Sequence, residues 1–253
     1  DLDNANYDRI LQIAKERTAN AAAWTFTIVG NFDEAVLRGY IEQYIASLPG
    51  DAKKKENYKN VVERPTGVVV NKFTKKMETP KAMARMYWYS TTAPYTLENS
   101  ILADAAGQVL GKLYLQKIRE EAGAAYSAAA VGSAQMVGDR VFTTLLGHCP
   151  MKPEMADEAT KIMREEVVAI SKSVDEATLN DIKAVLLKDA NEAEKENSHW
   201  LSVINLYVSR GIDTETDYKS IVNSLTPAKV SAFVKNVILK AGNNVEVIML
   251  PEK

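Results

Sequence analysis

Hydrophobic positions in the N-terminal part of the chain change from helical to strand spacing and back. Residues 4–20 carry apolar side chains at helical spacing with charged residues between them, which predicts a helix. Residues 24–30 are rich in β-branched and aromatic side chains and end at a glycine, which predicts a strand. Asp33 is a suitable N-cap for a second helix, which we expect to end at Leu48-Pro49-Gly50.

A polar segment, residues 51–64, follows this helix and contains the run Lys53-Lys54-Lys55. Aromatic residues do not alternate with these lysines, as they do in sites that stack single-stranded nucleic acid. We therefore interpret the segment as a solvent-exposed linker and keep a nucleic-acid patch as the less favoured alternative. The main boundary of the chain falls here.

The rest of the chain predicts strands and helices that do not alternate strictly. The predicted strands are residues 67–73, 82–91, 125–133, 140–148 and 244–250. The predicted helices are residues 95–121, 153–171, 174–195, 197–209 and 226–240. Such a mixture favours an α+β fold with two layers, a mostly antiparallel sheet backed by helices.

Local signals set the ends of several of these elements. Gly123 follows the longest predicted helix and suits its C-terminal stop, and Gly138-Asp139 suits a hairpin turn. Ser173 and Glu176 have the spacing of a capping box. Thr226-Pro227 predicts an N-cap followed by proline in the first helical position.

The predicted order of elements in residues 1–50 is helix, strand, helix, and the chain ends in a similar way with a predicted helix followed by a predicted strand. We therefore expect residues 1–50 to be the tail of a preceding α/β domain and residues 65–253 to be a complete α/β domain. The length of 253 residues is enough for one to two domains. The chain begins at Asp1 rather than at methionine, which we interpret as a processing site or a fragment boundary.

The composition excludes several classes of protein. With 46% hydrophobic and 25% charged residues, neither disorder nor a fibrous repeat fits. The 31 Lys and Arg against 33 Asp and Glu give a net charge of -2, which provides no overall attraction to nucleic acid or anionic membranes. The sequence has no apolar run of transmembrane length, and its single cysteine excludes an internal disulfide.

Several common catalytic motifs are missing from the sequence. The Gly107–Gly111 stretch lies in a helical pattern and lacks the Lys-Ser/Thr of a phosphate-binding loop. His148 and Cys149 are adjacent on a predicted strand, so their side chains should point to opposite faces and not form a dyad. Neither His148 nor His199 lies in a zinc-binding motif, and the acidic residues near His199 favour a solvated helix face.

Three segments resemble the C-terminal part of the insulinase/pitrilysin-like (inverzincin) zinc metallopeptidases, which include the mitochondrial processing peptidase. The first is Phe26–Asp33, followed by a helix ending in Ser47-Leu48-Pro49. The second is the leucine-rich helix of residues 110–121, and the third is Gly123-Ala124-Ala125-Tyr126-Ser127. Their order and spacing resemble the family across nearly the whole chain.

The resemblance implies a fold and an activity. In this family four similar α/β domains of the LuxS/processing-peptidase-like metallohydrolase fold form two halves that enclose a peptide. An H-x-x-E-H helix in the first domain binds zinc and supplies the general base. This sequence lacks that motif. The resemblance therefore implies the substrate-binding part of a metalloendopeptidase, with no metal site of its own, zinc bound outside this chain, and no activity alone.

Arg119 and Tyr126 have the spacing of an arginine and a tyrosine in the last domain of that family. The resemblance implies that both are catalytic and substrate-binding, the arginine at a peptide carbonyl and the tyrosine at the oxyanion. Ser127 is implied as a further substrate-binding residue. Considered without the resemblance, Arg119 also suits a solvated cation at a helix end and Tyr126 a core residue.

The implied partners are an N-terminal catalytic half, in the same polypeptide or in a partner subunit, and a peptide substrate. Neither nucleic acid nor a membrane span is implied. The similarity to bacterial members favours a periplasmic location. The alternative hypothesis is a non-catalytic member of the same family that holds peptides or supports a complex. The presence of both Arg119 and Tyr126 favours the peptidase.

Overall fold

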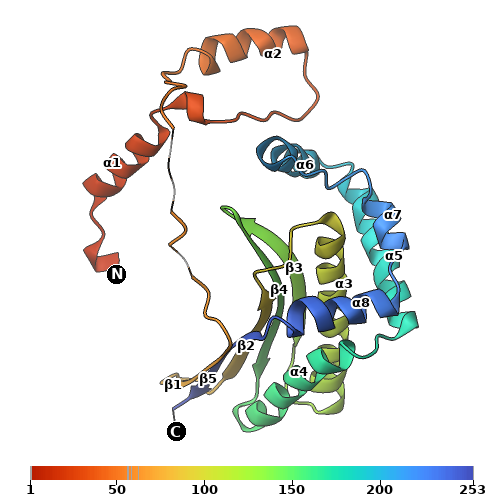
Figure 1. Ribbon diagram of the computed structural model, residues 1–253. Helices are drawn as coiled ribbons and strands as arrows, with labels where there is room; N and C mark the ends of the chain where they lie inside the picture. The colour runs from red at the N-terminus through yellow and green to blue at the C-terminus, as the bar shows by residue number, and fades with distance from the viewer. Residues whose placement is uncertain (1, 56, 58, 62, 253) are drawn as a thin grey trace.

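A computed structural model describes residues 2–55, 57, 59–61 and 63–252. It contains a twisted sheet with helices packed on one face and a separate helical region formed by the N-terminal residues (Figure 1). No helix within the described residues combines the length and apolar character needed to cross a membrane.

The sheet has five strands in the order β1-β5-β2-β4-β3. These are β1 (Val68–Lys75), β5 (Asn243–Pro251), β2 (Ala82–Ser90), β4 (Arg140–Met151) and β3 (Ala129–Val137). All neighbours are antiparallel except β1 and β5, which pair in parallel. The predicted α+β class with a mostly antiparallel sheet is confirmed.

Helices cover one face of this sheet, and no helix of the described residues covers the other, which we call the open face (Figure 1). The helices of this domain are α3 (Leu97–Tyr114), α4 (Ala156–Ile170), α5 (Glu176–Ala193), α6 (Asn197–Arg210), α7 (Tyr218–Asn223) and α8 (Pro227–Phe233). Helices α3 and α8 continue into wider π-type turns, Leu115–Glu121 and Val234–Leu239. The short helix α7 has no counterpart among the predicted elements.

The core lies between the sheet and the helices. Met86 of β2, Leu110 and Tyr114 of α3 and Met163 of α4 are fully buried there. The Tyr114 hydroxyl donates a hydrogen bond of 2.8 Å to the backbone carbonyl of Met163, so the one polar group in this cluster is satisfied. Alternate residues of β2 point away from this core, and Arg85 is exposed on the open face.

Helix α3 approaches strand β3 backbone to backbone. A Cβ added at Gly132 would lie 1.7 Å from the carbonyl oxygen of Ala103, and one added at Gly107 would lie 2.0 Å from the amide nitrogen of Gly132. Both positions therefore require glycine, because any side chain would collide with backbone atoms that cannot rotate away.

The N-terminal residues form helix α1 (Tyr7–Thr18) and helix α2 (Glu34–Tyr40), with an extended segment between them. The predicted strand at residues 24–30 is wrong, because no strand of the described residues lies beside this segment to complete a ladder. In the described residues up to 50, the only buried side chain is Asn20. A hydrogen bond of 2.5 Å from Thr27 Oγ1 to Asn205 Oδ1 links the segment to α6.

Several predicted helix starts are confirmed, and two element boundaries are corrected. The side chains of Asp33 and Thr226 cap α2 and α8. Helix α5 is capped by Asp175, which accepts a bond of 2.7 Å from the Thr178 amide, so the predicted capping box starting at Ser173 is wrong. Strand β3 starts at Ala129 rather than at residue 125, because the chain is still leaving the turn after α3.

Candidate functional site

Arg119 lies in the π-type turn that continues helix α3. Ile118 next to it is fully buried, whereas Arg119 is exposed. Two residues earlier, the Lys117 ammonium lies 2.5 Å from the carboxylate of Glu166, a buried residue of α4. The backbone on the N-terminal side of Arg119 is thus anchored to the core while its guanidinium faces solvent. Single π-type turns of this kind occur often at functional sites.

The chain reverses direction directly after this turn. Gly123 has a φ of 59°, a left-handed conformation that glycine adopts without strain, as predicted for a helix stop. Ala124 is bonded on both sides, its amide to the carbonyl of Ile118 at 2.9 Å and its carbonyl to the amide of Lys152 at 3.0 Å. The backbone that leads to Tyr126 is therefore fixed between the helix end and the residue that follows strand β4.

The reversal brings Arg119 and Tyr126 together on the surface. The guanidinium carbon of Arg119 lies 5.4 Å from the centroid of the Tyr126 ring, within the range of a cation–π interaction. Tyr126 is 87% exposed, so the expectation of a core tyrosine is wrong. An exposed cation–π pair contributes about 0.5–1 kcal/mol, which orders both groups but leaves them free to bind a ligand.

Ser127 is also exposed and follows Tyr126 directly, before strand β3 begins. Its carbonyl lies 4.0 Å from the Cys149 sulfur, which fixes the backbone beside β4. The three residues predicted as the site, Arg119, Tyr126 and Ser127, thus form one short surface region. The geometry places their polar groups in solvent, and their catalytic roles remain predictions.

Sequence reasoning missed a second polar pair on the open face of the sheet. Arg85 and His148 are direct cross-strand neighbours, and the Arg85 Nε lies 3.4 Å from His148 Nδ1. Burial lowers the pKa of His148, and the nearby Arg85 charge lowers it further. Ala129, the first residue of β3, pairs with His148 in the ladder, so this pair is adjacent to the strand that follows Ser127.

Cys149 points to the opposite face from His148, as predicted, and is fully buried in the core. Burial raises the pKa of its thiol to about 11. A thiol in this environment is protonated at neutral pH and is a poor nucleophile. A Cys-His dyad is therefore excluded by the geometry.

The described residues contain no group of three or more His, Cys, Asp or Glu side chains that could hold a metal ion. His148 lies in β4, whereas His199 lies in α6 and binds Glu215 at 3.0 Å. A peptidase zinc site needs three convergent protein ligands, and these two histidines do not provide them. The expectation of a solvated helix face is wrong for His199, whose side chain is only 22% exposed.

The end of the predicted linker lies against the open face of the sheet. Arg64 packs over the rings of Phe142 and Tyr89, at 4.2 and 5.4 Å from their centroids, and donates to Thr144 at 3.1 Å. The Tyr89 hydroxyl donates to the carbonyl of Pro65. The linker is therefore attached to the sheet at this end rather than fully solvated.

Comparisons with known proteins agree with this fold. A family model described as the peptidase M16 inactive domain matches residues 4–186. No curated protein sequence matches the chain.

Among solved structures, the periplasmic protease PqqL from Escherichia coli is similar with a TM-score of 0.71 at 21% identity, over 88% of this chain and 25% of that one. A protease from Helicobacter pylori has a TM-score of 0.71 at 17% identity, over 88% of this chain and 54% of its own. A peptidase M16 inactive domain from Pseudomonas fluorescens has a TM-score of 0.69 at 13% identity, over 88% and 53% of the two chains. The chain thus spans between a quarter and about half of these relatives.

Proposed function

Because the chain belongs to the peptidase M16 family, matching the part described as its inactive domain, we propose that it is the substrate-binding part of a zinc metalloendopeptidase. The whole enzyme encloses and hydrolyses peptides. Its zinc and general base belong to another half, in the same polypeptide or in a partner subunit. In support, the chain spans only about half of the proteases from Helicobacter pylori and Yersinia pestis that it resembles.

The exposed Arg119–Tyr126 pair is the observation that carries this proposal. The Arg119 guanidinium has planar donors that can bind a peptide carbonyl, and the Tyr126 hydroxyl can donate to the oxyanion that forms on it. Neither side chain has a carboxylate partner among the described residues, and Tyr126 is 87% exposed. Both groups are therefore accessible to a substrate, on a backbone that is fixed on either side.

We assign residues 1–50 to the tail of a preceding α/β domain and residues 65–253 to a complete domain. The support is the contrast in burial between them. Large apolar side chains of the N-terminal part, such as Trp24, Phe26 and Ile28, are between 43% and 50% exposed. An extended segment with this composition suits the edge of a sheet that another part of the enzyme supplies. We also propose a periplasmic location, since PqqL is a periplasmic protease.

The test is kinetic and uses the chain together with the protein that carries the zinc motif. Hydrolysis of a quenched fluorescent peptide is measured for Tyr126→Phe, with Tyr207→Phe as the control, because Tyr207 is also exposed but lies in α6. Loss of one oxyanion donor lowers kcat by about 10²–10³-fold. We expect that loss for Tyr126→Phe and an unchanged rate for Tyr207→Phe.

Three results contradict the proposal in different ways. An unchanged kcat for Tyr126→Phe removes this tyrosine from the mechanism. Failure to find any metal-bearing partner that gives activity, while the chain still binds peptides, favours a non-catalytic, peptide-holding member of the family. Chelator-sensitive cleavage by the chain alone contradicts the assignment of zinc to another half.

A further inference from the structure

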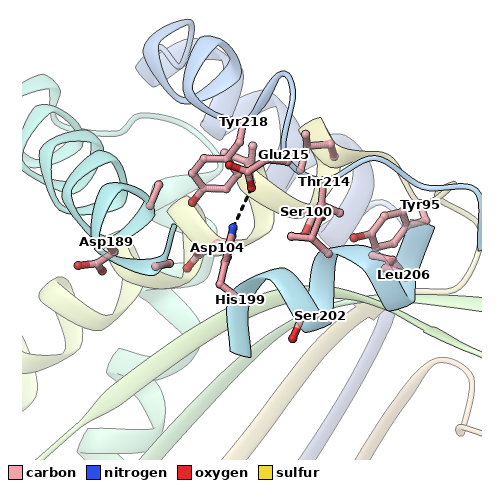
Figure 2. Close-up of a pocket in the computed structure, with 15 residues that line it drawn as sticks. Tyr95, Ser100, Asp104, Asp189, His199, Ser202, Leu206, Thr214, Glu215 and Tyr218 are labelled. Carbon is pink, nitrogen blue, oxygen red and sulfur yellow. Dashed lines mark hydrogen bonds and ion pairs between the residues drawn. The ribbon is translucent and has the colours of Figure 1, made fainter. Parts of the chain in front are cut away.

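A cavity of about 400 Å³ lies between helices α3, α5 and α6 and the segment that leads into α7. Figure 2 shows its polar side chains, which come from all of these elements. Asp104 in its wall is 10 residues before Tyr114, where α3 ends, which corresponds to about 15 Å at 1.5 Å per residue, and Arg119 lies in the π-type turn beyond that end. The cavity is therefore separate from the proposed catalytic region.

One part of the cavity is apolar. Leu97 and Ile101 of α3, Ala193 of α5, and Val203 and Leu206 of α6 contribute to its lining. A cavity with walls of this kind binds the hydrocarbon part of a ligand, because water is released from both surfaces.

Three carboxylates, those of Asp104, Asp189 and Glu215, line the same cavity as the phenol of Tyr218. The pKa of Tyr218 is raised by burial and then by the negative charges of all three. The pKa of Asp104 is also raised, mainly by burial; a hydrogen bond from Gln108 opposes this, and the charge of Asp189 adds to it. The electrostatic effects of three acids thus converge near the Tyr218 hydroxyl, which Figure 2 shows beside Glu215 and above Asp104.

These negative charges are only partly compensated by the protein. His199 binds Glu215 at 3.0 Å, and Lys219 pairs with Glu194 just outside the cavity lining. Among the described residues, the side chain of Asp104 has one hydrogen-bond partner, the neutral amide of Gln108, at 3.1 Å. Within the part of the chain that the structure describes, neither Asp104 nor Asp189 forms an ion pair with a lysine or arginine. Asp104 is half-buried and Asp189 is exposed at the rim of the cavity. A half-buried carboxylate beside a second carboxylate favours a bound cation.

We propose that this cavity binds a primary alkylammonium group, with its charge between Asp104, Asp189 and the Tyr218 hydroxyl and its alkyl chain along Ile101 and Leu206. An ammonium has three donors, which match these three acceptors. The apolar walls distinguish it from a metal ion, whose ligands would have to surround it. The group is supplied either by the side chain of a lysine in a peptide or by a free aliphatic amine.

The test is a titration of the folded chain followed by amide chemical shifts, with the fluorescence of Trp200 in α6 as a second readout. The probe is n-pentylammonium chloride, and n-pentanol is the neutral probe of the same shape. We expect saturable shifts at residues lining the cavity with the amine and much weaker shifts with the alcohol. Equal binding of both probes, or no saturable binding of the amine, overturns the proposal.

Variants locate the site. Asp104→Asn combined with Asp189→Asn removes two charges with little change of shape, and we expect amine binding to weaken at least tenfold. Asp181→Asn is the matched control on α5, because Asp181 is exposed and pairs with Lys112 outside the cavity. Its affinity should match that of the unchanged chain. Retention of full affinity by the double variant, with its circular dichroism spectrum unchanged, contradicts the assignment.

A second pair of probes distinguishes the two sources of the ammonium group. Nα-acetyl-lysine-N-methylamide represents a lysine within a peptide, and n-pentylammonium represents a free amine. Tighter binding of the lysine derivative assigns the cavity to a protein partner or peptide with an exposed lysine. Tighter binding of pentylammonium assigns it to small aliphatic amines.

Discussion

The carboxylate of Glu166 lies 2.5 Å from the ammonium of Lys117, so helix α4 holds the turn that carries Arg119. The Glu166 side chain is 7% exposed and that of Lys117 is 38% exposed. A buried carboxylate that loses its paired cation is strongly unfavourable, because its desolvation is no longer offset. This pair is therefore more important for the local structure than a typical surface ion pair.

Lys117→Met should destabilise the folded chain by about 2 kcal/mol, a value reduced because the lysine is partly exposed. Lys112→Met is the control on the same helix, since its partner Asp181 is 73% exposed; we expect a loss of less than about 0.5 kcal/mol. Urea unfolding measures both. The double variant Lys117→Met, Glu166→Leu should recover stability, and a double variant as unstable as Lys117→Met would contradict this explanation.

The close contact between α3 and β3 predicts a large effect of one methyl group. Gly132→Ala places a Cβ 1.7 Å from the Ala103 carbonyl, so strand and helix must separate, at a cost of about 3 kcal/mol or more. Gly39→Ala is the matched control, because an added Cβ there has no neighbour within 4 Å and the residue lies in α2. Alanine should stabilise that helix by up to about 1 kcal/mol. Similar melting temperatures for the two variants would refute the contact.

Asp175 predicts a pH dependence of stability. The amide of Thr178 donates to its carboxylate and lowers its pKa in the folded state. Its contribution is therefore complete above the unfolded pKa of about 3.9 and is lost as pH falls through the lower, folded pKa. Asp175→Asn retains a capping side chain without the charge. The stability difference between the two proteins, measured by urea unfolding from pH 6 to pH 3, should shrink as the pH falls.

Cys149 should resist thiol reagents in the folded chain. Its pKa of about 11 and its complete burial leave almost no accessible thiolate at pH 8. Labelling with Ellman's reagent should be far slower than in urea-unfolded chain, where the same thiol is fully accessible. Rapid labelling without urea would show that strand β4 opens readily.

Sequence patterns predicted those features that depend on nearby residues. The caps at Asp33 and Thr226 and the turn glycines at 123 and 138 need only local backbone geometry, and all four are present. The proximity of Arg119 and Tyr126 is of the same kind, because a single tight reversal joins them. Short-range chemistry of this type can be read directly from the residues.

Features that need a distant partner were not predictable in this way. Residues 24–30 have strand composition, but a strand requires a neighbour, and the described chain provides none there. The Arg85–His148 pair depends on the register of β2 against β4. The contact of His199 with Glu215 depends on the path of the chain between α6 and α7. In each case the pattern specified the residue type but not what lies beside it.

The parallel pairing of β1 with β5 has a consequence for synthesis. Val69 is paired with Val245, so β1, the first strand in the sequence, cannot pair in the sheet until β5, the last strand, has left the ribosome. Strand β2 also needs β5 as one of its two neighbours. The sheet therefore closes only after β5 has been synthesised, and the exposed apolar side chains of the N-terminal part are made long before that strand. Cells that make this protein must keep the nascent chain from aggregating until its final strand is available.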